Sequence, residues 1–348
     1  MALITFTDRG IYCPQADVYI DPWRKVDRAL ITHAHADHSR WGMKHYLAQH
    51  DSIPIMRLRL GQDISAQGVD YGEKLYINGV EISFHPAGHI TGSAQIRVAY
   101  QGEIWVISGD YKAEDDGLCT AFEPVKCQHF ITESTFGLPV YRWKPQEEIF
   151  ADINAWWSQN AAEGKATLLT GYSLGKAQRL IQGLNEEIGP IYTHGAVENT
   201  NEVLRAHGIE IKHTRRVILQ GPEKQKKADF KGAMIVAPPS AAGSTWARRF
   251  GPTSLGMASG WMSLRGARRR RAADRGFILS DHADWEGLNM AIKETSAEHI
   301  YVTHGYSNLF AKWLNTQGYD AHVIETLFEG EVNEENEGET KEAASPNA

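Results

Sequence analysis

Cysteine is scarce in this chain, and long apolar runs are absent. The 348 residues include three cysteines, Cys13, Cys119 and Cys127, and none stands at C-x-x-C spacing. The odd number and the spacing argue against a disulfide framework and against a thiolate metal site, so we expect small buried side chains. No run of about 18 apolar residues could span a bilayer, and residues 1–12 lack the apolar segment of a secretory signal. We therefore expect a cytoplasmic protein without membrane contact.

Length and composition are typical of a globular protein without internal repeats. With 42% hydrophobic residues, the chain can bury a sizeable core and is long enough for two domains. The formal net charge is −7, of which residues 331–348 contribute −5 through six glutamates and one lysine, which leaves −2 for residues 1–330. This acidic tail has almost no apolar side chains, and we expect it to be disordered. The net charge therefore does not exclude a nucleic-acid partner.

One short segment is strongly basic. Six arginines fall within eleven residues, close to Trp261: Arg265, Arg268, Arg269, Arg270, Arg271 and Arg275. Such a cluster can contact the phosphates of a nucleic acid. The alternative is a loop whose arginines are solvated or paired within the protein. We take Arg268, Arg269 and Arg270 as candidate substrate contacts.

The most informative motif is H-x-H-x-D-H at residues 33–38. His33, His35, Asp37 and His38 follow residues 28–32, whose composition is typical of a short buried strand. A loop leaving that strand can aim these side chains at one point, whereas a helix would turn some of them away. Imidazole and carboxylate ligands suit zinc, manganese or iron, so the motif predicts a metal site and leaves the ion open. A polar loop with surface histidines explains so dense a cluster poorly.

Further histidines and acids stand where other β-like stretches end. The stretches near residues 83–86, 103–107, 129–133, 276–280 and 299–303 are followed or ended by His89, Asp110, Glu133, His282 and His304. In layered α/β folds, functional sites gather at the edge of the sheet where strands pass into loops. We therefore expect these side chains to converge with the first motif. His85, His194 and His299 are expected to be ordinary packing or surface residues.

Residues 141–274 show an alternation of their own, which predicts an inserted α/β domain. Strands are expected near residues 166–170, 190–193 and 233–237, with helices near 176–184 and 198–207. The turn from Thr170 to Lys176 could hold a phosphate through Ser173 and Lys176 at a helix start, or it is simply a capping turn. Trp156 and Trp157 are expected in the core.

Together these motifs resemble the metallo-β-lactamase fold, and within it the β-CASP branch of nucleases. H-A-H-A-D-H at 33–38, His89 and Asp110 match the ligands of that fold in order and approximate spacing, while Glu133, His282 and His304 match three further motifs of the branch. The resemblance covers roughly residues 1–330 and is strongest to bacterial exonucleases associated with DNA ligase, which are relatives of the Artemis-type repair nucleases. It implies an αββα sandwich (1–140 and 275–330) with an inserted α/β β-CASP domain (141–274), followed by the acidic tail (331–348).

The resemblance also implies a site for two divalent ions, zinc or alternatively manganese. One ion would take His33, His35 and His89, the other would take Asp37, His38 and His304, and Asp110 would be shared. Two such ions suit hydrolysis of a phosphodiester bond. His282 would protonate the departing sugar oxygen and Glu133 would orient it, so the implied catalytic residues are Asp37, His282 and Glu133. The alternative for the last two is a buried pair that joins two strands.

The function implied is that of a metal-dependent DNA exonuclease in repair, acting on single-stranded DNA from the 5′ end, with a functional association with DNA ligase and helicase. Exonuclease action rests on the resemblance alone. His304 keeps an RNA-processing nuclease open, because a histidine at this position is usual in RNA-cleaving members of the branch and valine in eukaryotic DNA-repair members. A small-molecule metallohydrolase is disfavoured by the inserted domain and the basic cluster, and an inactive nucleic-acid-binding scaffold is disfavoured by the complete ligand set.

Overall fold

The computed structural model describes residues 2–264 and 273–327, and within them the chain forms two compact units. Unit 1 contains the described residues of 1–142 and 281–330, and unit 2 those of 143–280. The arginine cluster from Arg265 to Arg271 and the acidic tail lie outside the described residues, so only Arg275 of that cluster is described. Among residues 2–264 and 273–327, none of the helices is long and apolar enough to cross a membrane.

Unit 1 contains two mixed β-sheets. The first has the strand order β1-β2-β3-β4-β5-β6, antiparallel through β3 and parallel from β3 onward. Its strands are Thr5–Thr7, Gly10–Cys13, Val18–Ile20, Arg28–Ile31, His45–Gln49 and Ala66–Val69. The second has the order β19-β18-β11-β10-β9-β8-β7, parallel from β19 to β10 and antiparallel from there to β7. Taken from β7 to β11 and then β18 and β19, its strands are Leu75–Ile77, Val80–Pro86, Ala94–Tyr100, Glu103–Ile107, His129–Ser134, His299–Gly305 and Asp320–Val323.

The two sheets of unit 1 share one apolar core. Ile20 and Leu30 of the first sheet belong to the same buried cluster as Phe84, Ile96 and Trp105 of the second. Because successive side chains of a strand point to opposite faces, the neighbours of these core residues point away from it. At β10 and β11 the opposite face is apolar as well, because Val106 and Phe130 belong to a second buried cluster, so this part of the sheet has to be covered on both faces.

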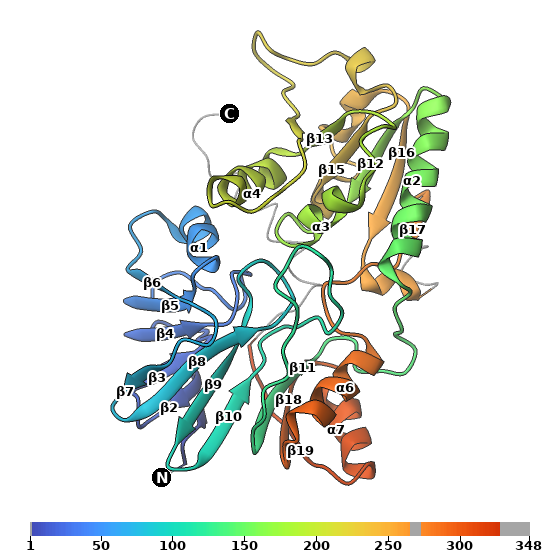
Figure 1. Ribbon diagram of the computed structural model, residues 1–348. Helices are drawn as coiled ribbons and strands as arrows, with labels where there is room; N and C mark the ends of the chain where they lie inside the picture. Colours follow the sequence, from blue (N-terminus) through green and yellow to red (C-terminus); the bar gives the residue numbers. More distant parts are fainter. Residues whose placement is uncertain (1, 265–272, 328–348) are drawn as a thin grey trace. The chain divides into compact units, whose positions relative to one another are not determined.

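Helices cover the outer faces of this sandwich (Figure 1). Val106 and Phe130 of the second sheet pack with Leu288 of α6 (Trp285–Thr295) and Phe310 of α7 (Ser307–Thr316) in a separate buried cluster. Helix α1 (Ser52–Leu60) lies beside β5 and β6 of the first sheet. This is the layered α/β sandwich that the sequence predicts.

Two glycines allow close backbone approaches at the strand ends where polar residues gather. Gly109 follows β10 with a φ of +57°, and a Cβ there would lie 2.5 Å from Thr32 Oγ1. Gly305 at the end of β18 has a φ of +77°, and a Cβ there would overlap the carbonyl oxygen of Ser134. Since L-residues rarely adopt such backbone angles, glycine allows the adjoining Asp110 and His304 to sit tightly against neighbouring strands.

Unit 2 has a parallel sheet, as expected for an inserted α/β domain. Its order is β14-β13-β15-β12-β16-β17, with strands at Arg215–Arg216, Ile191–Thr193, Met234–Ala237, Ala166–Thr170, Thr253–Ala258 and Arg275–Phe277. Its helices are α2 (Gln146–Ala162), α3 (Lys176–Gly183) and α4 (Gly195–Ala206), with short 3₁₀ turns η1 (Lys227–Phe230), η2 (Pro239–Ala241), η3 (Ala247–Phe250) and η4 (Gly260–Ser263).

Some details of the expectation hold and others differ. Trp156 and Trp157 are buried, as expected. The strand near residue 276 pairs with β16 of unit 2, whereas we expected it to belong with the sandwich strands. Its backbone finds a partner at the edge of the parallel sheet. Of the three cysteines, which are all free, Cys119 is only half-buried rather than buried.

The core of unit 2 depends on an aromatic cluster around Phe230. This side chain is fully buried, and its ring centre lies 5.1 Å from that of Tyr192 and 4.7 Å from that of Phe250. We predict that Phe230→Ala lowers the free energy of unfolding by about 3–5 kcal/mol, because it leaves a cavity that cannot close. Urea denaturation followed by fluorescence measures this. The matched control is Phe6→Ala, since Phe6 is 41% exposed; equal losses in both variants would contradict the prediction.

Candidate metal centre

The loop that follows β4 places four potential ligands in the interior of unit 1. His33, His35, Asp37 and His38 are all buried, and no helix or strand is formed between residues 32 and 44. Backbone bonds fix the loop at its start and middle: Ala94 N–H donates to the Thr32 carbonyl over 2.8 Å, and Ser39 N–H donates to that of His35 over 2.8 Å. The expectation that a loop rather than a helix carries the motif is therefore confirmed.

Asp110 stands at the middle of the centre. Its Oδ2 lies 3.7 Å from His33 Nε2, 3.6 Å from His38 Nε2 and 3.9 Å from His89 Nε2. Its Oδ1 lies 3.3 Å from His304 Nε2. These imidazoles come from the ends of β4, β8 and β18, so one carboxylate brings together three separate strand ends. Asp37 joins the group through its Oδ2, 3.6 Å from His38 Nε2.

A hydrogen bond orients the His89 ring for binding. Its Nδ1–H donates to the carbonyl oxygen of Asp281 over 2.8 Å. Nε2 then carries the lone pair and faces the centre, where it lies 3.0 Å from His35 Nδ1. Metal-bound histidines commonly have such a second hydrogen bond, which sets both the tautomer and the direction of the ring.

The donor atoms fit a divalent metal ion. Three sets of side chains have ligand atoms within 4.8 Å of one another: His33, His35, His89 and Asp110; His33, Asp37 and His38; and Asp110, Glu133 and His282. Two ligands of one tetrahedral zinc ion are about 3.3 Å apart, close to the spacings around Asp110. Within the described residues, the buried atom His33 Nε2 has no hydrogen-bond partner. Buried polar atoms without a partner are costly, and a shared cation would satisfy them.

The electrostatics of the centre also favour a cation. Burial, together with the imidazoles of His282 and His35, lowers the pKa of His89 to about 4, which keeps this ring in the neutral form that binds metal. Burial opposes protonation of His38 as well, but the carboxylates of Asp37, Asp110 and Asp21 outweigh it and raise the pKa of His38 to about 10. In the absence of an ion, the site thus draws a positive charge to this position.

Asp21 is a candidate functional residue that the sequence pattern did not reveal. This carboxylate is buried directly after β3, and its Oδ2 accepts a hydrogen bond from His38 Nδ1 over 2.7 Å. It also accepts bonds from the backbone N–H and the hydroxyl of Thr32, over 2.8 and 2.5 Å. The available signal was an acid directly after the apolar stretch Val18–Ile20, the same kind of position as that of Asp110. Asp21 thereby ties the β4 loop to β3 and orients His38.

Glu133 and His282 form a hydrogen-bonded pair beside the ligand cluster. His282 Nδ1 lies 2.9 Å from both carboxylate oxygens of Glu133, and Glu133 Oε1 also accepts from the Tyr111 N–H over 2.9 Å. The His282 ring centre is 4.6 Å from that of His89. The pair is therefore next to the candidate metal ligands, and its carboxylate is held by the backbone as well as by the imidazole.

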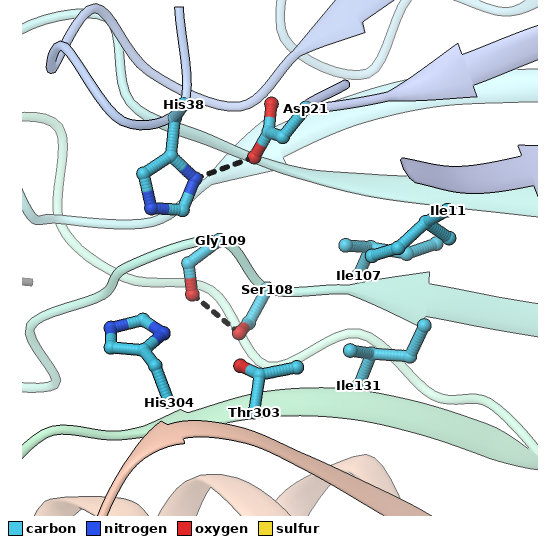
Figure 2. A pocket seen from close by; sticks show the side chains of 9 residues that line it. All are labelled: Ile11, Asp21, His38, Ile107, Ser108, Gly109, Ile131, Thr303 and His304. Carbon is cyan, nitrogen blue, oxygen red and sulfur yellow. Dashed lines mark hydrogen bonds and ion pairs between the residues drawn. The ribbon is translucent and has the colours of Figure 1, made fainter. Parts of the chain in front are cut away.

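A small cavity of about 10 Å³ lies beneath the centre, with room for about one water molecule. Figure 2 shows His38 and His304 on one side of it and Ile11, Ile107 and Ile131 on the other. The isoleucines belong to the core between the two sheets. The three isoleucines therefore form an apolar floor beneath His38 and His304.

Of the candidate substrate contacts, two belong to unit 2 and three fall outside the described residues. Ser173 is half-buried in the turn before α3, within unit 2. Lys176 is fully buried with its Nζ 4.8 Å from the ring centre of Tyr172, so it is not a surface cation. The capping alternative has direct support, because the Gly175 N–H donates to Gln178 Oε1 over 2.8 Å. Arg268, Arg269 and Arg270 fall in the segment that is not described.

Curated proteins similar to this chain act on nucleic acids according to their names. A probable DNA ligase of Opitutus terrae is 29% identical over 328 residues, which cover 90% of this chain and 30% of that protein. The cleavage and polyadenylation specificity factor subunit 3-I of Arabidopsis thaliana is 27% identical over 205 residues (48% of this chain, 28% of that protein). The endoribonuclease ysh-1 of Neurospora crassa is 31% identical over 128 residues (35% and 15%). The chain spans less than a third of the length of these relatives.

Structural similarity supports the fold. A crystal structure of a protein of unknown function from Enterococcus faecalis superposes with a TM-score of 0.57 at 11% identity, covering 86% of this chain and 80% of the other. No family model matches the chain. The predicted α/β fold class, with mixed sheets in a sandwich and a separate parallel sheet, is confirmed, and the chain has nuclease relatives.

The hydrogen bonds of Asp21 lead to a prediction about metal affinity. Asp21→Asn keeps the shape of the side chain but removes the negative charge that supports His38. We expect the affinity for zinc to fall by about 10- to 100-fold, measured by competition with a chelating indicator. Asp17→Asn is the matched control, because Asp17 also has a positive φ but is exposed and bonded to Tyr12 and Arg28. Equal affinity in both variants would show that Asp21 does not support the ligand.

Proposed function

We propose that this chain is a metal-dependent nuclease that hydrolyses phosphodiester bonds, with single-stranded DNA as its substrate. The observation that carries the proposal is the placement of Asp110 among four imidazoles, with the His282–Glu133 pair in the same buried centre. The ligands would be His33, His35, Asp37, His38, His89, Asp110 and His304. The ions that we propose are two zinc or manganese ions.

Each part of the centre has a chemical use in this reaction. Divalent ions bound there would supply Lewis acidity, which activates a water molecule and neutralises charge on the phosphate. The protein holds the ligands in place before the substrate arrives, because the hydrogen bonds to Asp21 and to the Asp281 carbonyl fix the rings of His38 and His89. The apolar floor lowers the local dielectric and strengthens these interactions.

His282 is the proposed general acid. Its Nδ1–H donates to Glu133, so the proton exchanged with a substrate is on Nε2. The bonds to Glu133 fix the direction of the ring, and the bond from the Tyr111 N–H holds the carboxylate still. Protonation of the sugar oxygen, as its bond to phosphorus breaks, avoids formation of an unstable alkoxide. General acid catalysis of this kind accelerates a reaction by about 10²- to 10⁴-fold.

The choice of DNA draws on a relative that aligns with 90% of this chain and is named a probable DNA ligase. We extend the proposal to exonuclease action in DNA repair, from the 5′ end, in functional association with DNA ligase and helicase. RNA is the second candidate, because His304 stands beside Asp110 and the partial relatives include an endoribonuclease.

Matched DNA and RNA oligonucleotides test the substrate. Each strand is labelled at one end and then at the other, and it is incubated with the protein and either zinc or manganese. We expect stepwise shortening of single-stranded DNA from the 5′ end, and loss of cleavage after Asp37→Ala. RNA cleavage without DNA cleavage would reject the DNA substrate. Cleavage unaffected by Asp37→Ala would reject the metal centre as its source.

A second experiment separates proton donation from a structural role for His282. We predict that His282→Gln lowers kcat on DNA by about 10²- to 10⁴-fold while leaving the bound metal unchanged. The same variant should lose much less activity on bis(p-nitrophenyl) phosphate, because p-nitrophenolate leaves without a proton. If both substrates lose activity equally, His282 is not the general acid.

A further inference from the structure

We propose that Trp41 is a stacking platform for one unpaired base of a nucleic-acid strand whose backbone enters the metal centre. This inference rests on the proposed nuclease function and adds to it a residue that selects single strands. Trp41 is neither a metal ligand nor a member of the His282–Glu133 pair.

The exposure of Trp41 is the first observation. Its side chain is 65% exposed, whereas Trp105, Trp156 and Trp157 are buried. Of the large hydrophobic side chains in the described residues, only Tyr76 is more exposed, at 67%. Leaving an indole in water forgoes the stabilisation that its burial would bring. A binding role at the surface would explain why an exposed tryptophan stands at this position.

The position of Trp41 is the second observation. It follows the ligand His38 by three residues, so the two Cα atoms are at most about 11 Å apart. The loop between them is held by Arg40, whose Nε donates to the Asp37 carbonyl over 3.2 Å. Arg59 donates to the Ala34 carbonyl of the same loop. A base on Trp41 would therefore belong to a nucleotide close to the phosphate at the metal centre.

The indole is also held ready on one side. Lys25 Nζ lies 4.7 Å from the Trp41 ring centre, a cation–π contact. The stem of Lys25 passes directly over Gly42, where a Cβ would lie 2.7 Å from Lys25 Cε and where φ is +99°. A glycine at 42 thus lets the lysine reach the ring. A pre-positioned ring loses less rotamer freedom when a ligand binds.

The surrounding charge matches a phosphate backbone. Lys25, whose ammonium lies over the Trp41 ring, and Lys44, three residues after Trp41 in the sequence, are both exposed, and Arg40 precedes Trp41 directly. Proteins that bind single strands combine cations along the backbone with aromatic rings that stack on bases, largely without regard to sequence. In a duplex the base faces are already covered by their neighbours, so such a platform favours unpaired strands.

The experiment compares Trp41→Ala and Trp41→Phe with the wild-type protein, and uses Tyr76→Ala as the matched control. Tyr76 is as exposed as Trp41, but it lies on β7 opposite Glu81 of β8. Glu81 stands near the start of β8, whereas the candidate ligand His89 follows the other end of that strand. Binding is followed by fluorescence anisotropy with a labelled oligothymidylate that contains phosphorothioate linkages to slow hydrolysis. An abasic strand of the same length presents the same backbone without bases.

We expect Trp41→Ala to weaken oligothymidylate binding by about 5- to 100-fold, and Trp41→Phe to retain most of the affinity. Tyr76→Ala should bind as the wild type does, and the abasic strand should bind equally to the wild type and to Trp41→Ala. Unchanged affinity after Trp41→Ala, or an equal loss on the abasic strand, overturns the stacking role while leaving the nuclease proposal standing if the wild type cleaves DNA. A wild-type protein that neither binds nor cleaves single strands overturns both, and would leave Trp41 as a contact for another protein.

Discussion

The candidate site depends on one buried carboxylate. Asp110 lies within 3.9 Å of imidazole nitrogens from three strand ends, and each of those groups would be costly to bury alone. Because they lie around a common point, the carboxylate and the imidazoles can compensate one another. The tight turn at Gly109 and the bonds of Asp21 to Thr32 and His38 serve this arrangement, since they determine where the β4 loop can lie against β10. The geometry of unit 1 at this edge follows from that requirement.

Much of this arrangement could be predicted from the sequence, because the local pattern carries it. A histidine or an acid stands at the end of a buried strand, or within three residues after it, at β4, β8, β10, β11 and β18, and strand ends at one edge of a layered fold come together. Residues whose role depends on a partner distant in the sequence were harder to recognise. Asp21 acts through Thr32 and His38, which the parallel pairing of β3 with β4 brings beside it. Nothing in the composition around residue 276 indicates that β17 pairs with β16. Burial of Lys176 likewise depends on packing within unit 2.

The apolar floor beneath the candidate ligands is also part of the core of unit 1. Ile11, Ile107 and Ile131 come from both sheets of the sandwich, so the core that stabilises unit 1 also closes the centre from below. Shape changes in this core would be transmitted to the ligands, since protein interiors are close-packed and transmit strain. Stability and site geometry are therefore not independent in this unit, and a substitution in the core can alter chemistry without touching a ligand.

The division of unit 1 into two chain segments has a consequence for biosynthesis. Strand β18 lies between β11 and β19, and it carries His304, yet it is synthesised about 170 residues after Glu133. At typical rates of translation that interval lasts about 10–30 s, during which β11 is an uncovered sheet edge and Glu133 has no His282. The emerging chain holds five of the seven proposed ligand side chains in the first hundred residues, with Asp110 soon after, so the proposed cluster stays incomplete during this interval. The order of synthesis thus makes the final 50 described residues the step that completes both the sheet and the metal centre.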